Sequence, residues 1–201
     1  MKTLSDIPAQ KNRSRSFGPA APVEILQWEF EFENLLDLYV QRRPKRVLEI
    51  GTYHGGTLYH WLKNATRDTT VVSVDSYAAG VDNRRLYDAW TPPGVTLKVL
   101  CGDCHSDEIA LEAKLAGPFD WIFIDADHYY ESVKRDWETY RPMAADDGVI
   151  VLHDVEPQTE IYPEIQVNQL WREIQREGYV TQELVAAGDV PGCGIGIVYL
   201  G

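Results

Sequence analysis

The chain has 201 residues, of which 44% are hydrophobic, and a formal net charge of −12. This size and apolar content suit one compact domain with a full core. The negative charge argues against nucleic acid or an anionic membrane as the main partner, because both bind basic surfaces. No apolar run reaches the length of a membrane span, and the N-terminal residues lack the apolar middle of a secretory signal. We therefore expect a cytoplasmic protein.

The N-terminal part of the chain changes character at Val23. Residues 1–22 are polar and contain prolines and a small basic cluster, which predicts a mobile arm. From Val23 onward the apolar residues have the spacing of an amphipathic helix, which we expect to span 23–42 and to stop before Pro44. This cap helix would open a single domain, 23–201. Its aromatic side chains could also cover a ligand site or serve a homodimer.

Short apolar runs alternate with helical patterns along the rest of the chain. We predict strands at 46–50, 70–75, 95–100, 119–124 and 149–152, followed by two last strands at 180–185 and 195–200. The alternation predicts a Rossmann-like, doubly wound α/β sheet with helices on both faces. Most strands would be parallel, with an antiparallel C-terminal strand. Ligands of such sheets bind at the carboxyl ends of the strands, near the point where strand order reverses.

Ionisable residues gather where the predicted strands end. They are Glu49, Asp75, Asp103, Asp125, His128, His153 and Asp154. Because the carboxyl ends of parallel strands share one edge of the sheet, these side chains should lie near one another. We interpret this edge as the functional site rather than as solvated surface.

The stretch Arg46–Thr57 reads RVLEIGTYHGGT and combines a strand, a glycine turn and a helix start. Glycine has no Cβ, so the backbone can approach a nucleotide-like ligand closely at this turn. Asp75, at the end of the next strand, stands where an acid accepts the hydroxyls of an adenosine ribose. Glu49 precedes the first glycine, Gly51, and would repel a pyrophosphate but suit a positively charged ligand. The turn also departs from G-x-G-x-x-G, which counts against a nicotinamide-dependent dehydrogenase.

The chain has three cysteines, Cys101, Cys104 and Cys193, and no even disulfide framework. The segment Cys101–His105 matches the haem-attachment pattern C-x-x-C-H and contains the redox spacing C-x-x-C. Haem attachment needs an exported chain, and a redox pair needs a thiol with a lowered pKa at a helix N-terminus. We favour ordinary cysteines in a loop at the end of a strand.

Several segments resemble the class I S-adenosylmethionine (SAM)-dependent methyltransferases. They read VLEIGTYHGGT, VVSVDS, LCGD, FDWIFIDADHYYESVKRDWETYRPMAADDGVIVLHD and GIGIVYL. The resemblance spans about Arg46 to Leu200. Its most specific block, from the fourth to the fifth strand, looks like the metal-dependent O-methyltransferases. These include the catechol-type enzymes and the cephalosporin-hydroxylase-like group that methylates antibiotics and sugars.

The resemblance implies SAM as cofactor. The glycine turn and Glu49 would hold its methionine part, Asp75 its ribose, and Asp103 with the amide of Cys104 its adenine. The implied cofactor-binding residues are Glu49, Gly51, Tyr53, Gly55, Asp75, Ser76, Asp103, Cys104 and Asp125.

The same resemblance implies a divalent metal held by Asp125, His153 and Asp154. Two carboxylates suit Mg²⁺, which prefers oxygen ligands. His153 stands where relatives carry an acid, and an imidazole would favour Mn²⁺, Fe²⁺, Co²⁺ or Zn²⁺, unless it only orients Asp154. Asp125 would also be catalytic, and neutral His128 could take the proton of an acceptor hydroxyl. Alternatively, Asp125 and Asp154 merely cap the helices that follow them.

We therefore expect a SAM-dependent methyltransferase that methylates a hydroxyl of a small molecule with the help of the metal. The acceptor could be a sugar, a phenol or catechol, or a natural-product intermediate, selected by the arm and by loops 76–83 and 155–167. Arg84 and Arg85 could pair with an anionic acceptor. Two alternatives remain: a metal-independent N- or O-methyltransferase on the same fold, and a cofactor-binding partner protein without catalysis.

Overall fold

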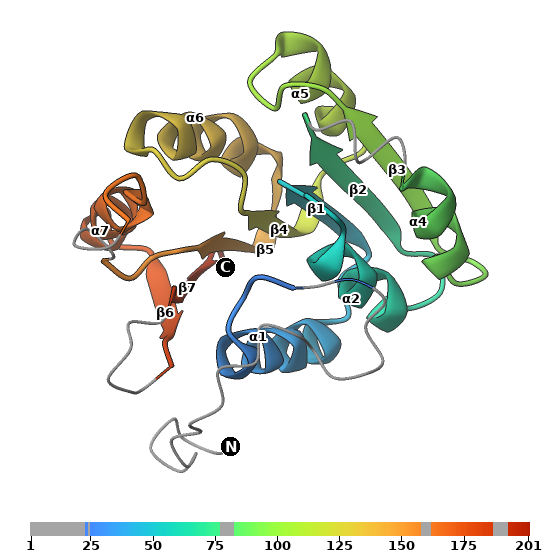
Figure 1. Ribbon diagram of the computed structural model, residues 1–201, viewed down its shortest axis with the longest axis horizontal. Helices are drawn as coiled ribbons and strands as arrows, with labels where there is room; N and C mark the ends of the chain where they lie inside the picture. Colours follow the sequence, from blue (N-terminus) through green and yellow to red (C-terminus); the bar gives the residue numbers. More distant parts are fainter. Residues whose placement is uncertain (1–22, 24, 77–82, 158–161, 187–192) are drawn as a thin grey trace.

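A seven-stranded sheet forms the centre of the computed structural model, which describes residues 23, 25–76, 83–157, 162–186 and 193–201 (Figure 1). The strand order is β3-β2-β1-β4-β5-β7-β6. Strands β1 to β5 pair in parallel, whereas β7 runs antiparallel to both β5 and β6. The strands are β1 (Arg46–Ile50), β2 (Thr70–Asp75), β3 (Thr96–Cys101), β4 (Phe119–Ile124), β5 (Ala144–His153), β6 (Val180–Leu184) and β7 (Ile195–Tyr199). The predicted doubly wound sheet is confirmed.

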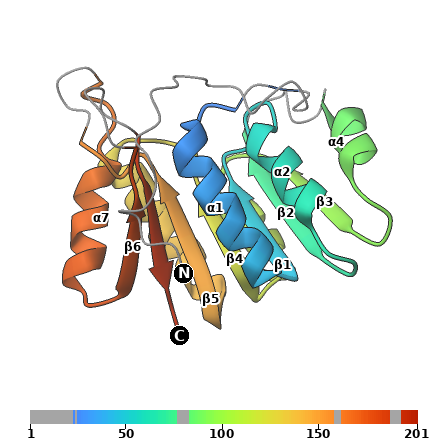
Figure 2. The same ribbon diagram turned by 90° about the horizontal axis from the view of Figure 1, so that it is seen from below.

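Helices cover both faces of the sheet because neighbouring residues of its central strands point to opposite sides and are both apolar. On one face, Val47 packs in a cluster with residues of α1 (Glu29–Arg42), α2 (Gly56–Asn64) and α4 (Arg84–Trp90). Figure 2 shows these three helices side by side. On the other face, Leu48 packs in a cluster with residues of α5 (Asp107–Lys114), α6 (Tyr130–Tyr140) and α7 (Val167–Arg176). A 3₁₀ turn, η2 (Arg141–Met143), leads into β5.

The cap helix differs from the prediction at its start. It begins at Glu29 instead of residue 23, because Trp28 is extended (φ −66°, ψ 134°) and Ile25 and Gln27 are buried in a non-helical segment. Two aromatic side chains of the helix, Phe32 and Tyr39, pack in the core instead of covering the site, and the ring centroids of Tyr39 and Trp61 lie 4.9 Å apart. The arm 1–22 lies outside the described residues. Within the described part of the chain, no helix has the length and apolar character needed to cross a bilayer.

Glu31 fastens α1 to the connection between β6 and β7. Its fully buried carboxylate accepts hydrogen bonds from the backbone N–H groups of Ala186 (2.9 Å) and Gly194 (3.1 Å). Burial raises the pKa of Glu31, while these two hydrogen bonds oppose that rise. The N-terminal segment and the start of β7, which are far apart in sequence, are thereby held together.

Replacing Glu31 with alanine should lower the free energy of unfolding by about 2 kcal/mol, because two backbone N–H groups lose their acceptor. Urea denaturation of the variant and the parent chain measures this loss. Glu33, an exposed acid of the same helix, supplies the control variant Glu33→Ala, which should change stability much less. Equal losses for the two variants would refute the role of Glu31.

Candidate functional site

The site lies where strand order reverses, at the carboxyl ends of β1 and β4. Gly51 leaves β1 with φ +88°, and a Cβ at this position would overlap the backbone carbonyl of Asp125. The backbone N–H of Asp125 donates to Ile50 (2.8 Å), and that of Gly51 donates to Val74 (2.9 Å). Only glycine allows this positive φ and close approach without strain. The glycine turn and the end of β4 are therefore in direct backbone contact.

Glu49 supports the glycine turn from beneath. Its fully buried carboxylate accepts hydrogen bonds from Thr57 Oγ1 (2.6 Å), Thr52 Oγ1 (2.9 Å) and Trp61 Nε1 (2.9 Å). Burial raises its pKa to about 7, although the three hydrogen bonds oppose the rise. These hydrogen bonds to the Glu49 carboxylate all come from side chains of the protein. The predicted contact of Glu49 with a ligand therefore stays a prediction.

Asp75 also holds the turn. Its Oδ2 accepts the backbone N–H groups of Thr52 (2.7 Å) and Tyr53 (2.6 Å). Gly55, the N-cap of α2, has φ +90°, and a Cβ there would come within 2.5 Å of the Tyr87 ring. The acids at the ends of β1 and β2 thus fix the shape of the turn on which the predicted cofactor would lie.

Two cavities adjoin this turn, and we name each after a strand that ends in it. The β2 cavity, of about 460 Å³, is bordered by most of the predicted cofactor residues. They are Gly51, Tyr53, Asp75, Ser76, Asp103, Cys104 and Asp125. Of the predicted set, Glu49 and Gly55 border neither cavity, as far as the described residues define them.

The β5 cavity, of about 540 Å³, contains the predicted catalytic and metal residues Asp125, His128, His153 and Asp154. It shares Gly51, Tyr53, Asp125 and Ala126 with the β2 cavity. A molecule in one cavity therefore lies next to a molecule in the other, with Asp125 at the junction.

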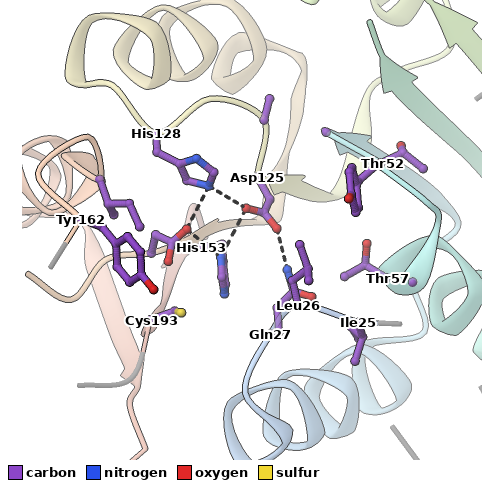
Figure 3. Close-up of a pocket in the computed structure, with 16 residues that line it drawn as sticks. Ile25, Leu26, Gln27, Thr52, Thr57, Asp125, His128, His153, Tyr162 and Cys193 are labelled. Atoms are coloured by element: carbon purple, nitrogen blue, oxygen red, sulfur yellow. Dashed lines mark hydrogen bonds and ion pairs between the residues drawn. The ribbon is translucent and has the colours of Figure 1, made fainter. Parts of the chain in front are cut away.

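Four ionisable side chains converge in the β5 cavity (Figure 3). His128 Nε2 lies 3.0 Å from Asp154 Oδ2 and 3.6 Å from Asp125 Oδ1. His153 Nδ1 lies 3.1 Å from Asp154 Oδ2 and 3.3 Å from Asp125 Oδ1. Although these two distances are short, His153 Nδ1 makes no aligned hydrogen bond with either carboxylate. The structure thus brings together all the residues predicted to bind metal or transfer a proton.

The charges of this cluster balance one another. Burial raises the pKa of a carboxyl group, but the two imidazoles offset this effect and lower the pKa of Asp125 and Asp154 below the ordinary range. Asp125 and Asp154 raise the pKa of His128 to about 10, and they raise that of His153 despite its burial. Without a bound ion, the two carboxylates therefore favour the protonated form of both imidazoles. The expectation that His128 titrates near neutrality therefore does not match the structure.

The backbone aims Asp154 into the cavity. It follows β5 in the left-handed region, with φ +61°, a conformation that is uncommon for residues other than glycine. Asp125 is held from the opposite side by Gln27, whose Nε2 donates to its Oδ2 at 2.6 Å. Asp125 is therefore held by a distant part of the chain, whereas Asp154 is directed by its own backbone conformation.

The sequence did not indicate several residues that border the β5 cavity. They are Ile25, Leu26, Gln27, Thr52, Gly56, Thr57 and Cys193. Tyr162 and Ile165 also border this cavity and belong to the loop 155–167, which was expected to face an acceptor. Arg84 borders neither cavity and pairs with Asp88 (3.1 Å), so the structure offers no support for its contact with an anionic acceptor.

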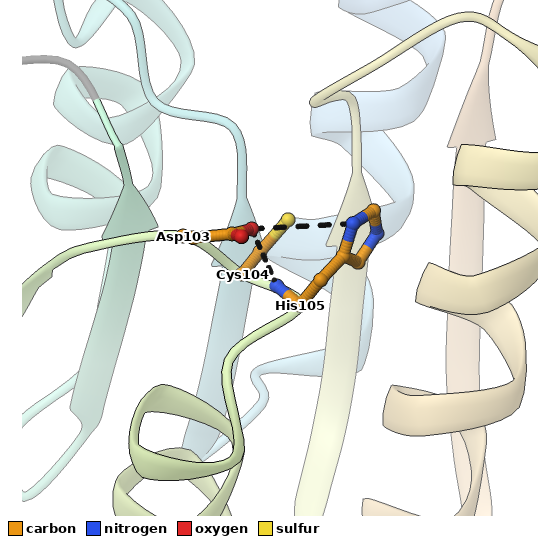
Figure 4. Close-up of side chains that lie close together, drawn as sticks. All are labelled: Asp103, Cys104 and His105. Atoms are coloured by element: carbon orange, nitrogen blue, oxygen red, sulfur yellow. Dashed lines mark hydrogen bonds and ion pairs between the residues drawn. The ribbon is translucent and has the colours of Figure 1, made fainter.

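The loop after β3 carries the C-x-x-C-H pattern (Figure 4). Asp103 Oδ1 accepts the backbone N–H of His105 (2.9 Å), and His105 Nε2 lies 3.0 Å from the buried Asp136. Burial and the nearby Asp136 raise the pKa of the Cys104 thiol. A redox-active cysteine needs the opposite shift, so the structure favours the interpretation of Cys104 as a loop residue beside the β2 cavity.

Residues 48–155, which carry the glycine turn and the ends of β2 to β5, match the model of a family described as "Methyltransferase domain". The chain belongs to this methyltransferase family. Its fold and site identify it as a SAM-dependent methyltransferase of class I, as the sequence predicts. None of the curated proteins matches the chain.

Solved structures share the fold of this methyltransferase. An O-methyltransferase from Bacillus cereus in complex with SAH is 20% identical, with a TM-score of 0.68 over 90% of this chain and 84% of that one. TomG, an O-methyltransferase from Streptomyces achromogenes in complex with SAM, is 18% identical, with a TM-score of 0.63 over 90% and 82%. MycE, from the mycinamycin biosynthetic pathway, is 17% identical, with a TM-score of 0.55 over 83% of this chain and 48% of its own length.

Replacing Glu49 with glutamine should change how stability depends on pH. The pKa of Glu49 rises from its ordinary 4.5 to about 7 on folding, so the folded chain holds this proton more tightly than the unfolded chain. Stability from this group is present below pH 4.5 and is lost as pH rises through 7. Relative to Glu49→Gln, the parent chain should lose up to about 3 kcal/mol across this window. Urea denaturation of both chains at several pH values tests this, and parallel profiles would refute it.

Proposed function

We propose that this methyltransferase transfers the methyl group of SAM to a hydroxyl oxygen of a small molecule, assisted by a divalent ion. The observation that carries the proposal is the convergence of two carboxylates and two imidazoles in a cavity that adjoins the predicted SAM cavity. Perturbed ionisable groups that gather in a cavity mark functional sites more often than structural ones.

The β2 cavity is the proposed SAM site. It extends from the glycine turn to Asp103, so a molecule bound along it would present one end at Asp125. The fixed turn, with Asp75 accepting two of its backbone N–H groups, supplies a preorganised surface for the amino-acid part of SAM. The Bacillus cereus enzyme was solved with SAH and TomG with SAM, which supports SAM as the cofactor of this fold.

The β5 cavity is the proposed acceptor site. Ile25, Leu26, Tyr162 and Ile165 give it apolar walls, whereas Asp125 and its three ionisable neighbours give it one polar end. This division suits a phenol, a catechol or the body of a natural-product intermediate whose hydroxyl points toward Asp125. A sugar would use fewer of the apolar contacts.

Asp125, Asp154 and His153 have the chemistry of a divalent-ion site. Both carboxylates and the buried imidazole reach one point, and His153 Nε2 has no hydrogen-bond partner among the described residues. A bound ion would lower the pKa of an acceptor hydroxyl and so favour its attack on the methyl group. MycE was solved in complex with Mg, SAH and mycinamycin VI, which supports a metal in this fold.

His128 is the proposed proton acceptor, on the evidence of its position. Its ring borders the cavity, and its Nε2 lies 3.0 Å from Asp154. Because the two carboxylates raise its pKa to about 10, His128 must begin the reaction in its neutral form if it is to take the proton. Otherwise it serves as a charge partner that holds both carboxylates in place.

The balance of charges supports one alternative. Two imidazolium groups can neutralise Asp125 and Asp154 without an ion, which would give a metal-independent methyltransferase on the same residues. Removal of metal distinguishes the two.

Asp154→Asn should lower kcat/KM for methyl transfer roughly a hundredfold or more, because the variant loses a negatively charged ligand of the ion that would activate the acceptor hydroxyl. EDTA should inactivate the parent chain to a similar extent, and added divalent ions should restore it. The measurement is SAH formation with catechol, a simple phenol and a vicinal diol as acceptors. Catechol should exceed the phenol, because its two neighbouring oxygens can both approach the ion.

Asp146, an exposed residue at the opposite end of β5, supplies the matched control Asp146→Asn, which should retain activity. Turnover that survives both EDTA and Asp154→Asn would reject the metal and leave the metal-independent enzyme. SAM binding without SAH formation for any acceptor would indicate a cofactor-binding protein without catalysis.

A further inference from the structure

A cysteine lies beside the proposed ion site. Cys193 lies two residues before β7, and its carbonyl accepts the backbone N–H of Glu156 (3.0 Å). Gly194, the next residue, accepts the N–H of Val155 (3.3 Å) and donates its own N–H to buried Glu31. These bonds continue the pairing of β5 with β7 past His153. The backbone of Cys193 is therefore fixed next to Asp154, whatever rotamer its side chain adopts.

The side chains of Cys193, His153 and Asp154 form a group suited to hold an ion. Their sulfur, imidazole nitrogen and carboxylate oxygen all lie within 4.8 Å of one another. Asp125, His128 and Asp154 form a second such group, so Asp154 belongs to both. Figure 3 shows His128, Asp125, His153 and Cys193 around the same cavity. Oxygen, nitrogen and sulfur donors thus surround one small volume.

His153 supplies independent evidence for a ligand. Its ring is only 5% exposed, and Nε2 is buried without a hydrogen-bond partner among the described residues. Nδ1 lies near two carboxylates without an aligned hydrogen bond to either. Buried polar atoms without partners are costly and rare in folded proteins. An ion that accepts a lone pair from this imidazole would explain why such a residue stands at the end of β5.

We propose that Cys193 and His153 are ligands of the divalent ion and that they make this a transition-metal site. Thiolate and imidazole donors suit Zn²⁺, Co²⁺ or Fe²⁺, whereas Mg²⁺ prefers oxygen ligands and keeps several waters. The inference rests on the metal in the proposed function and deepens it, because it names the class of the ion. It concerns binding alone and does not depend on which acceptor is methylated.

Titration of the metal-free full-length chain with Co²⁺ tests the proposal directly. A cobalt ion bound by thiolate gives a sulfur-to-metal charge-transfer band in the near ultraviolet, which oxygen and nitrogen ligands do not give. The parent chain should show this band, and Zn²⁺ should remove it by displacing cobalt. Mg²⁺ in roughly hundredfold excess should not displace cobalt.

Cys193→Ser should abolish the band and weaken Zn²⁺ binding roughly tenfold to a hundredfold, measured by competition with a chromogenic chelator. Cys101→Ser is the matched control, because Cys101 is exposed at the end of β3 and borders neither the β2 nor the β5 cavity. This control variant should keep the band and the affinity for Zn²⁺. Cys193→Asp replaces sulfur with oxygen and should lose the band while shifting preference toward Mg²⁺. Circular dichroism verifies that each variant is folded.

A band that persists in folded Cys193→Ser, or cobalt that Mg²⁺ readily displaces, would overturn the proposal while leaving a metal-assisted methyltransferase intact. If the parent chain binds no ion at all, the inference and the metal in the proposed function fail together. SAH formation by the same metal-free preparation would then still establish a metal-independent methyltransferase. If the parent makes no SAH but shows the band and Cys193→Ser loses it, the proposed activity fails while the ion site stands.

Discussion

The backbone contact between Gly51 and Asp125 is the constraint on which the rest of the site depends. Strand order reverses between β1 and β4, so the chain leaves the sheet toward opposite faces there and opens a crevice at the carboxyl edge. A side chain at position 51 would collide with the end of β4. Because Gly51 avoids that collision, Asp125 stands at a fixed place between the two cavities. In the proposed reaction this contact would fix the position of the methyl donor relative to the acceptor, and such positioning supplies much of the catalysis.

The cluster of Asp125, His128, His153 and Asp154 is costly as a purely structural feature. Removing four charges from water requires nearly complete mutual compensation, and apolar residues of similar size would often be as stable. Here the compensation is present, since each imidazole lies close to both carboxylates. The cluster lies at the junction of two cavities and not within the apolar core, so we attribute its desolvation cost to a functional role. In the structure, His128 is a charge partner of both carboxylates.

The features that the sequence predicted well depend on local signals. Apolar runs bounded by glycine, proline or acids placed every strand, and alternation with helices determined the fold and the edge where the acids gather. The features that it missed depend on contacts between distant residues. Gln27 and Asp125 are separated by 98 positions, and the apolar residues around Gln27 have a spacing that imitates the first turn of a helix. Cys193 likewise reaches the site only because β7 returns antiparallel to β5.

Glu49 and His153 illustrate how ionisable residues take different roles at one edge. Glu49 lies within β1 and points beneath the turn, so three donors of the chain surround its carboxylate. His153 ends β5 and pairs in register with Ile195, which places Cys193 nearby, two residues before the adjacent strand. A carboxylate at position 153 would add a third negative charge beside Asp125 and Asp154. An imidazole would add a nitrogen donor without that repulsion, and the neighbouring thiol would complete the softer set of ligands that we propose. The proposed ion site therefore gives one explanation for both residues: the histidine that departs from the pattern expected of metal-dependent relatives, and the cysteine that no local signal marked.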